Sequence, residues 1–434
     1  MKDNTSKDIR PATFIDLFAG CGGLSLGLLR SGWRGLFAIE RSPDAFSTLQ
    51  LNLVDGKQSP TFDWPEWLPI QPWEIGDFID THRQSLEQLK GKVQMVAGGP
   101  PCQGFSFAGR RQEDDPRNQL FRKHLELVDI IKPQIVLLEN VQGMNIAFGK
   151  KKLKQGDCAT ASRKCYAEEI YQSLEEHGYE PRQEIIRAFR FGVPQLRPRF
   201  FTIGVRKDLV DANNKPDFFA MLEDIREQFL RDHGLPVDRS VTVAEAISDL
   251  TVTGKSLVTC EDTQSPPGFM EIAYVEPGTY YQKLMHGEYS GKMNSLRLPN
   301  HRPETIQRFK DIQSACRKGV QLSNEDRRTL GIKKHAIVPL HPDLPSHTLT
   351  TLPDDLLHYS EPRVHTVREH ARIQSFPDWF EFKGKYTTGG DRRTKECPRY
   401  TQVGNAVPPL LAEAIGTTLL KILDVLRSPD DITE

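Results

Sequence analysis

The sequence lacks several features that would assign it to a familiar class of protein. No run of about 18 apolar residues is present, so we expect no transmembrane helix, and the polar first ten residues lack the apolar core of an export signal. The seven cysteines form no C-x-x-C pair, which argues against a zinc site or a disulfide framework. We find no internal repeat and no low-complexity segment. These absences predict a globular, cytoplasmic protein with reduced thiols.

An excess of either charge is also missing from the chain as a whole. The formal net charge is −1, which argues against a globally basic nucleic-acid-binding protein. Residues 208–276, however, carry 5 Lys or Arg against 14 Asp or Glu, whereas residues 277–334 carry 12 against 5. The second segment is basic enough to bind phosphate, but a solvated helical surface explains it equally well.

Short apolar runs alternate with amphipathic stretches over the first 205 of the 434 residues. The expected strands are 13–20, 36–40, 93–99, 133–141 and 199–205, and the expected helices between them are 24–32, 120–132 and 166–178. This alternation predicts an α/β fold with a doubly wound, mostly parallel sheet that binds ligands at the carboxyl ends of its strands. A helix at 409–423 is expected to pack back onto the sheet. We therefore assign residues 1–205 and 398–434 to one domain and residues 206–397 to a second, smaller domain.

A glycine-rich turn, DLFAGCGG at residues 16–23, follows the first expected strand and begins a helix. It does not have the G-x-G-x-x-G spacing of a dinucleotide site. Glu40 ends the next expected strand, where a carboxylate can bind ribose hydroxyls, and Asp77 can accept a hydrogen bond from an adenine amino group. A nucleoside site that needs no phosphate indicates S-adenosylmethionine, although a tight turn and two helix caps would give the same pattern.

Several longer motifs occur in a fixed order between residues 14 and 409. They are FIDLFAGCGG (14–23), GGPPCQGFS (98–106), DDPRNQLF (114–121), LLENV (137–141), PQLRPRFF (194–201), VREHARIQSFPDWF (367–380) and QVGNAVPP (402–409). In content and order they resemble the motifs of the DNA (cytosine-5)-methyltransferases. The resemblance implies a Rossmann-like catalytic domain that binds S-adenosylmethionine and a smaller target-recognition domain.

The resemblance also implies how the reacting residues act. Cys102 adds to C6 of a cytosine flipped out of the duplex, and a thiol suits this covalent step because its thiolate is a strong nucleophile. Glu139 contacts N3 and the exocyclic amine of the base, and Arg199 contacts O2. Arg197 helps to position the loop or its phosphate. Without the other motifs, Cys102 would be read as a small buried hydrophobic residue.

Further roles follow from the same resemblance. The loop from Gln103 to Asn118 is expected to close over the base, and Arg368, Glu369 and Arg372 are expected to organise the smaller domain. Residues 277–334 and Thr348–Asp355 are the segments expected to contact the DNA grooves. The residues expected at the cofactor are Phe18, Gly20, Gly22, Gly23, Glu40, Asp77, Phe78, Pro100, Leu120 and Asn405.

Three alternatives fit the sequence less well. A tRNA-methylating member of the family would carry a Cys-Phe-Thr signature, which is absent. A decayed, non-catalytic DNA-binding protein would have lost Cys102, Glu139 or Arg199. An enzyme that methylates amino groups would need an Asn or Asp before the Pro-Pro pair. We therefore expect a monomeric, stand-alone enzyme acting on double-stranded DNA and not on a membrane, and the family context adds a cognate restriction endonuclease as a partner.

Overall fold

The computed structural model describes residues 11–58, 60–101, 118–145, 166–210, 215–274, 276–388, 392 and 396–426. Cys102 and the expected lid from Gln103 to Arg117 lie outside these described residues. Every helix in the described ranges is too short or too polar to cross a membrane.

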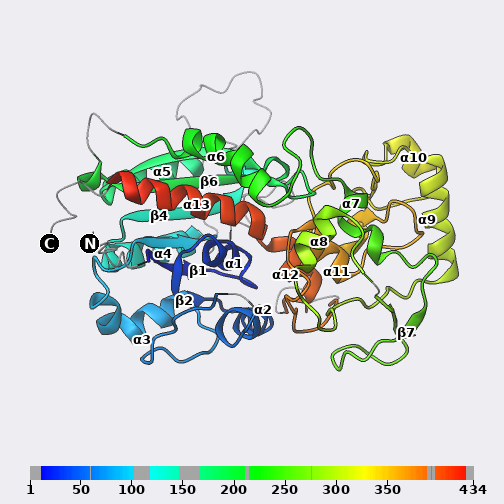
Figure 1. Cartoon of the computed structure of the whole chain (residues 1–434), viewed down its shortest axis with the longest axis horizontal. Coiled ribbons are helices and arrows are strands. Elements are labelled where there is room, and N and C mark those ends of the chain that lie inside the picture. The colour runs from blue at the N-terminus through cyan, green and yellow to red at the C-terminus, as the bar shows by residue number, and fades with distance from the viewer. Residues whose placement is uncertain are drawn as a thin grey trace, which may run out of the picture.

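A six-stranded sheet forms the centre of one half of the molecule (Figure 1). Its strands are β1 (Thr13–Leu17), β2 (Arg34–Ile39), β3 (Met95–Gly98), β4 (Ile135–Val141), β5 (Tyr179–Arg187) and β6 (Pro198–Arg206), in the order β2-β1-β3-β4-β6-β5. The first four strands in that order are parallel, and β6 runs antiparallel to both β4 and β5. The predicted α/β fold with a mostly parallel sheet is confirmed, whereas β5 was not predicted.

Apolar side chains cover both faces of this sheet, which is why its strands read as continuous apolar runs. In β1, Phe14 belongs to one buried cluster and Ile15 to the other. The helices around the sheet are α1 (Gly23–Arg30), α2 (Pro43–Leu49), α3 (Ile75–Glu87), α4 (Asn118–Ile131), α5 (Tyr166–Glu176) and α13 (Pro409–Leu426). Helices α1 and α13 pack together on the Phe14 side, and α3 and α4 pack together on the Ile15 side. The C-terminal helix therefore does return to the sheet, as predicted (Figure 1).

The other half of the molecule contains mostly short elements. They are α7 (Val243–Ile247), β7 (Leu257–Thr259), β8 (Met270–Ile272), α8 (Tyr280–His286), α9 (Pro303–Ala315), α10 (Asn324–Thr329), β9 (Val338–Pro339), β10 (Leu356–Leu357), α11 (Val367–Ile373) and α12 (Arg399–Asn405). The longer helix α6 (Phe218–Asp232) lies over the sheet half. Helix α6 packs against α13, whereas α9 and α10 lie at the far edge from the sheet (Figure 1). The division at residues 205 and 398 stays a prediction.

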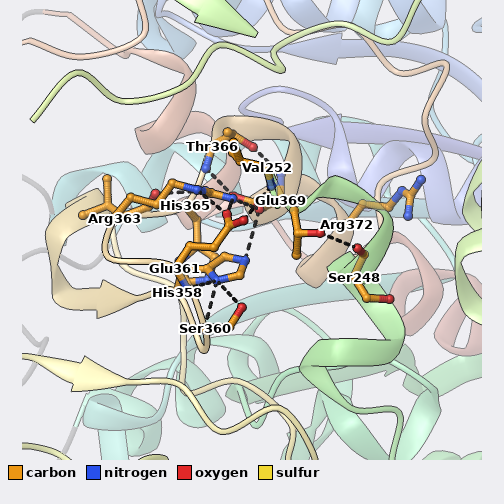
Figure 2. Close-up of polar contacts among 12 residues, drawn as sticks. Ser248, Val252, His358, Ser360, Glu361, Arg363, His365, Thr366, Glu369 and Arg372 are labelled. Carbon is orange, nitrogen blue, oxygen red and sulfur yellow. Dashed lines mark hydrogen bonds and ion pairs between the residues drawn. The ribbon is translucent and has the colours of Figure 1, made fainter. Parts of the chain in front are cut away.

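Buried ion pairs hold this second half together. Figure 2 shows Glu369 at the centre of one network, where the Arg363 guanidinium donates to both carboxylate oxygens at 2.7 Å. The amide of Thr366 donates to the same carboxylate, and Glu361 forms a second ion pair with Arg363. Because Glu369 is fully buried, its charge requires these partners.

Two neighbouring arginines of α11 act in the same way. Arg372 forms buried ion pairs with Asp249 and Asp378. Arg368 donates to the carbonyl oxygens of Asn294, Pro377 and Phe380. These contacts confirm that Arg368, Glu369 and Arg372 organise this half of the molecule.

Two buried histidines should make the stability of this half sensitive to acid. His365 and His370 are at most 1% exposed, and their ring nitrogens have no hydrogen-bond partner among the described residues. Burial lowers the pKa of His370 from 6.5 to about 4 and lowers the pKa of His365 as well. Below pH 6.5 the unfolded chain takes up protons that the folded chain does not, so the free energy of unfolding falls as the pH falls toward 4.

This loss is expected to be about 2 kcal/mol at pH 5 for His370 alone. Urea unfolding at pH 7.5 and pH 5 measures it, and His370→Phe should reduce the difference between the two free energies. His335→Gln, a change at an exposed histidine, is the matched control and should leave the difference unchanged. An equal pH dependence in the wild type and His370→Phe would contradict the prediction.

Candidate active site

Glu139 and Arg199 meet on neighbouring strands of the sheet. Glu139 lies near the end of β4. Arg199 lies near the start of the antiparallel strand β6 and pairs in register with Val141 of β4. Their side chains are 12% and 11% exposed, and the Arg199 Nε lies 3.0 Å from Glu139 Oε1. Burial raises the pKa of Glu139, and the positive charge of Arg199 opposes that rise. The result is a nearly buried carboxyl group held beside one guanidinium at this edge of the sheet.

The chain that leads into Cys102 passes directly beside this pair. A Cβ atom added to Gly99 would lie 3.2 Å from Glu139 Oε2, so the glycine permits a close approach of the backbone. The Asn140 side-chain amide donates to the Pro100 carbonyl at 3.2 Å. Asn140 thus holds the end of β4 against the chain at Pro100. Cys102 itself lies outside the described residues, two positions after Pro100.

Arg197 is fully buried and donates to backbone carbonyls. Its Nη2 lies 2.9 Å from the Gly404 oxygen and 2.7 Å from the Ala406 oxygen, and its Nη1 lies 3.4 Å from the Leu349 oxygen. These contacts hold the guanidinium against the backbone at Leu349, Gly404 and Ala406. The role of Arg197 in positioning the loop or its phosphate stays a prediction.

The glycine-rich turn and Glu40 form a second polar site, at the carboxyl ends of β1 and β2. Phe18, Gly20 and Gly22 have φ of 58°, 57° and 92°, so the turn adopts left-handed backbone conformations. The Gly20 amide donates to Glu40 Oε2 at 2.9 Å, and the Ser42 amide donates to Oε1 at 2.7 Å. Two backbone amides therefore fix the Glu40 carboxylate next to the turn, in the place that the sequence predicted.

The last motif of the chain also contacts this turn. A Cβ atom added to Gly23 would lie 2.4 Å from the Val407 carbonyl oxygen, so residues 405–407 lie against the start of α1. Asn405, the last residue of α12, is exposed at this point. The structure thus brings Asn405 to the side of the molecule that carries Gly20 and Gly23.

Three other residues expected at the cofactor lie on helices α3 and α4. Asp77 lies in the first turn of α3, a helix that the sequence did not predict. The ring of Phe78 is fully buried and packs 5.6 Å from the ring of Phe37, so its side chain belongs to the core. Leu120 is half-buried in α4 and packs against the same cluster.

The sequence reading missed Asp16, which lies in β1 beneath the glycine-rich turn. It is 1% exposed, and one carboxylate oxygen accepts a hydrogen bond from the Ser25 hydroxyl at 2.5 Å. The other oxygen has no partner among the described residues. Burial raises the pKa of this carboxyl to about 7. The only signal in the sequence was a charged residue inside an apolar strand, within the motif DLFAGCGG.

The segment Thr348–Asp355 lies against α12 and the last motif. Thr350, Thr351 and Leu352 are exposed, and a Cβ atom added to Gly404 would lie 2.3 Å from the Thr350 carbonyl oxygen. Helix α9, within the other expected groove-contact segment 277–334, exposes Arg308 and Lys310 farther away. The structure therefore brings Thr348–Asp355, but not α9, next to the last motif.

Comparison with known proteins agrees with this geometry. The C-5 cytosine-specific DNA methylase family matches residues 12–421. The chain is 29% identical to type II methyltransferase M.DdeI of Desulfomicrobium norvegicum, over 93% of this chain and 87% of that protein. It is 30% identical to type II methyltransferase M.PspPI of Psychrobacter sp., over 98% of this chain and 82% of that protein.

A solved structure shares the fold. It is a prophage-encoded protein of E. coli that was described as a DNA modification methyltransferase, with a TM-score of 0.60 and 24% identity over 95% of this chain and 99% of that one. The family match spans nearly all of the chain and includes both the glycine-rich turn and the Glu139–Arg199 pair. The chain therefore belongs to the C-5 cytosine-specific DNA methylase family and is an S-adenosylmethionine-dependent DNA cytosine methyltransferase.

Proposed function

We propose that this enzyme methylates C5 of one cytosine within a specific sequence of duplex DNA, through a covalent bond between Cys102 and C6 of the flipped base. The observation that carries the proposal is the Glu139–Arg199 pair beside the chain that enters the Cys102 loop. The relatives M.DdeI and M.PspPI are named type II methyltransferases, which supports a role as the modification enzyme of a restriction–modification system.

The residues of the pair suit the chemistry of a cytosine ring. C5 is a poor nucleophile until the Cys102 thiolate adds to C6, which places an electron pair on the N3, C4 and C5 atoms. Glu139, whose pKa burial raises, is suited to hold a proton at N3 with one carboxyl oxygen and to accept a hydrogen bond from the exocyclic amine with the other. Arg199 stabilises negative charge at O2. After C5 has gained a methyl group, loss of its proton and departure of the thiolate restore the aromatic ring.

The second polar site fits S-adenosylmethionine. Glu40 accepts hydrogen bonds from the Gly20 and Ser42 amides, and each carboxylate oxygen keeps a lone pair that suits a ribose hydroxyl. A Cβ atom added to Gly20 would meet no atom within 4 Å. Asn405 and the backbone around Pro100 border the same edge of the sheet. When bound, the cofactor supplies the methyl group. Phe18, Gly22, Gly23, Asp77 and Leu120 are the remaining residues that we assign to this site, and Phe78 contributes through its place in the core.

In duplex DNA, C5 and C6 of the stacked base are inaccessible to the enzyme, so the target base must leave the helix at a cost of a few kcal/mol. We assign the contacts that offset this cost to Thr348–Asp355 and to the basic residues of 277–334. The expected loop of residues 103–118 would close over the base. We further propose that a monomer acts, with residues 206–397 as the target-recognition domain and a cognate endonuclease encoded alongside.

Mapping of 5-methylcytosine in the DNA of a host that expresses the protein tests this proposal. Bisulfite sequencing should show full methylation of one cytosine in every copy of a short sequence, and none of it in cells that carry the empty vector. Absence of new 5-methylcytosine, or transfer of labelled methyl groups to tRNA but not to duplex DNA, would contradict the proposal.

A further inference from the structure

Gln195, just before β6, connects three segments that are far apart in the sequence. Its side chain is fully buried. The Gln195 Oε1 accepts hydrogen bonds from the Leu349 amide at 2.9 Å and from the Arg197 Nη1 at 3.4 Å. The Gln195 Nε2 donates to the Oε1 of Gln374, which follows α11. The Gln195 side-chain amide therefore donates to one segment of the chain, at Gln374, and accepts from another, at Leu349.

Backbone contacts reinforce this junction. The Leu196 amide donates to the Ser346 oxygen at 2.8 Å, and the Ser346 amide donates to the Pro194 oxygen at 2.9 Å. These two hydrogen bonds form an isolated parallel bridge between Gln195 and Ser346, so the segment that leads to Leu349 runs beside residues 194–196. The exposed part of the Thr348–Asp355 loop begins directly after Leu349.

The same junction reaches the turn beside the glycine-rich loop. The side chain of Gln374 donates to the Ala406 carbonyl, which also accepts from Arg197 at 2.7 Å. The chain that contains Gln195 continues within four residues to Arg199, which pairs with Glu139. Gln195 therefore lies where the Thr348–Asp355 loop, the reacting pair and the 404–406 turn meet.

We infer that Gln195 is a positioning residue that holds the Thr348–Asp355 loop in register with the Glu139–Arg199 pair. The inference rests on the proposed function, in which that loop contacts DNA and the pair contacts the flipped base. Without the side-chain amide, the buried Leu349 amide and the Gln374 oxygen would lose their partners, and the loop would shift to satisfy them. A shift of about 1 Å in the placement of a base can lower a rate by about 10²-fold.

Gln195→Met tests the inference, because methionine keeps the length of the side chain but neither donates nor accepts strongly. Gln183→Met is the matched control. Gln183 lies on β5, the strand beside β6. Among the described residues, its side chain donates one hydrogen bond, to the Ala167 carbonyl oxygen. Both variants are compared with the wild type at the DNA sequence that the methylation map identifies.

The readout is the single-turnover rate of methyl transfer for each active enzyme molecule. Active molecules are counted with a duplex that carries 5-fluorocytosine at the target position, which traps the covalent adduct because no proton is present at C5 to be lost. Affinity for S-adenosylmethionine and the melting temperature are measured in parallel. We expect Gln195→Met to lower the rate per active molecule at least tenfold, with cofactor affinity within twofold of wild type. Gln183→Met should leave that rate unchanged.

A Gln374→Met variant and the double variant complete the test. If one junction acts as a unit, the effects of the two changes on the rate will not multiply. A normal rate per active molecule in Gln195→Met, with only a lower melting temperature, would overturn the inference and leave Gln195 as a purely structural residue. If Gln195→Met does not fold, Gln195→Glu, which keeps the acceptor and removes the donor, is judged by the same criterion. Failure of the wild type to form the trapped adduct would instead refute the proposed function.

Discussion

Replacing Cys102 with alanine is expected to lower methyl transfer to DNA by more than about 10³-fold, while affinity for S-adenosylmethionine stays within about twofold of wild type. In the proposed mechanism, alanine removes the thiolate that adds to C6, so C5 does not become nucleophilic. The proposed cofactor site is formed by other residues, namely the glycine-rich turn and the Glu40 carboxylate held by two backbone amides. The measurement is transfer of a labelled methyl group to duplex DNA, together with calorimetric titration of the cofactor.

Cys316→Ala is the matched control for this change. Cys316 is half-buried at the end of α9, in the other half of the molecule, and should be replaceable without loss of methyl transfer. If Cys102→Ala lost cofactor binding together with activity, the thiol would have a structural role. Activity retained in Cys102→Ala would mean that another group attacks the base.

Glu139→Gln is expected to lower the rate of methyl transfer by about 10²- to 10⁴-fold with little change in fold. Glutamine keeps an oxygen that can accept the hydrogen bond from Arg199, but it cannot hold a proton at N3 of the base. The nearly buried position of the pair makes this loss large, since water cannot take over the role of the carboxyl group. Single-turnover kinetics with saturating cofactor measure the effect.

The sheet supplies a matched control for this change as well. Strand β6 lies between β4 and β5, and its residue Phe201 pairs in register with a glutamate on each side. These are Glu139 of β4 and Glu184 of β5. Glu184 is exposed, and Glu184→Gln should leave the rate within twofold of wild type. Equal rates for Glu139→Gln and the wild type would remove Glu139 from the reaction.

Much of the sheet could be predicted because its strands are buried on both faces. The runs that became β1, β2, β3, β4 and β6 are mostly apolar, with few polar residues inside them. β5 was missed because it is an edge strand whose residues alternate in burial and include Pro181 and several charges. Helix α3, which carries Asp77 and Phe78, was also not predicted from the sequence.

The site residues could be named from the sequence, but their contacts could not. Glu139 and Arg199 are 60 residues apart and meet only because β6 runs antiparallel beside β4. The burial of Arg197 depends on carbonyl oxygens of Leu349, Gly404 and Ala406, which no spacing rule brings together. The positioning role of Gln195 could not be predicted from the sequence. It depends on hydrogen-bond partners, Leu349 and Gln374, that only the folded chain brings together.

The adduct with a duplex containing 5-fluorocytosine tests the central claim most directly. After incubation with the cofactor, digestion and mass spectrometry should show the modified base attached to the peptide that contains Cys102, and the Cys102→Ala protein should form no adduct. An adduct on a different cysteine, or efficient methylation of cytosine in unmodified DNA without any trapped adduct, would contradict the proposed mechanism.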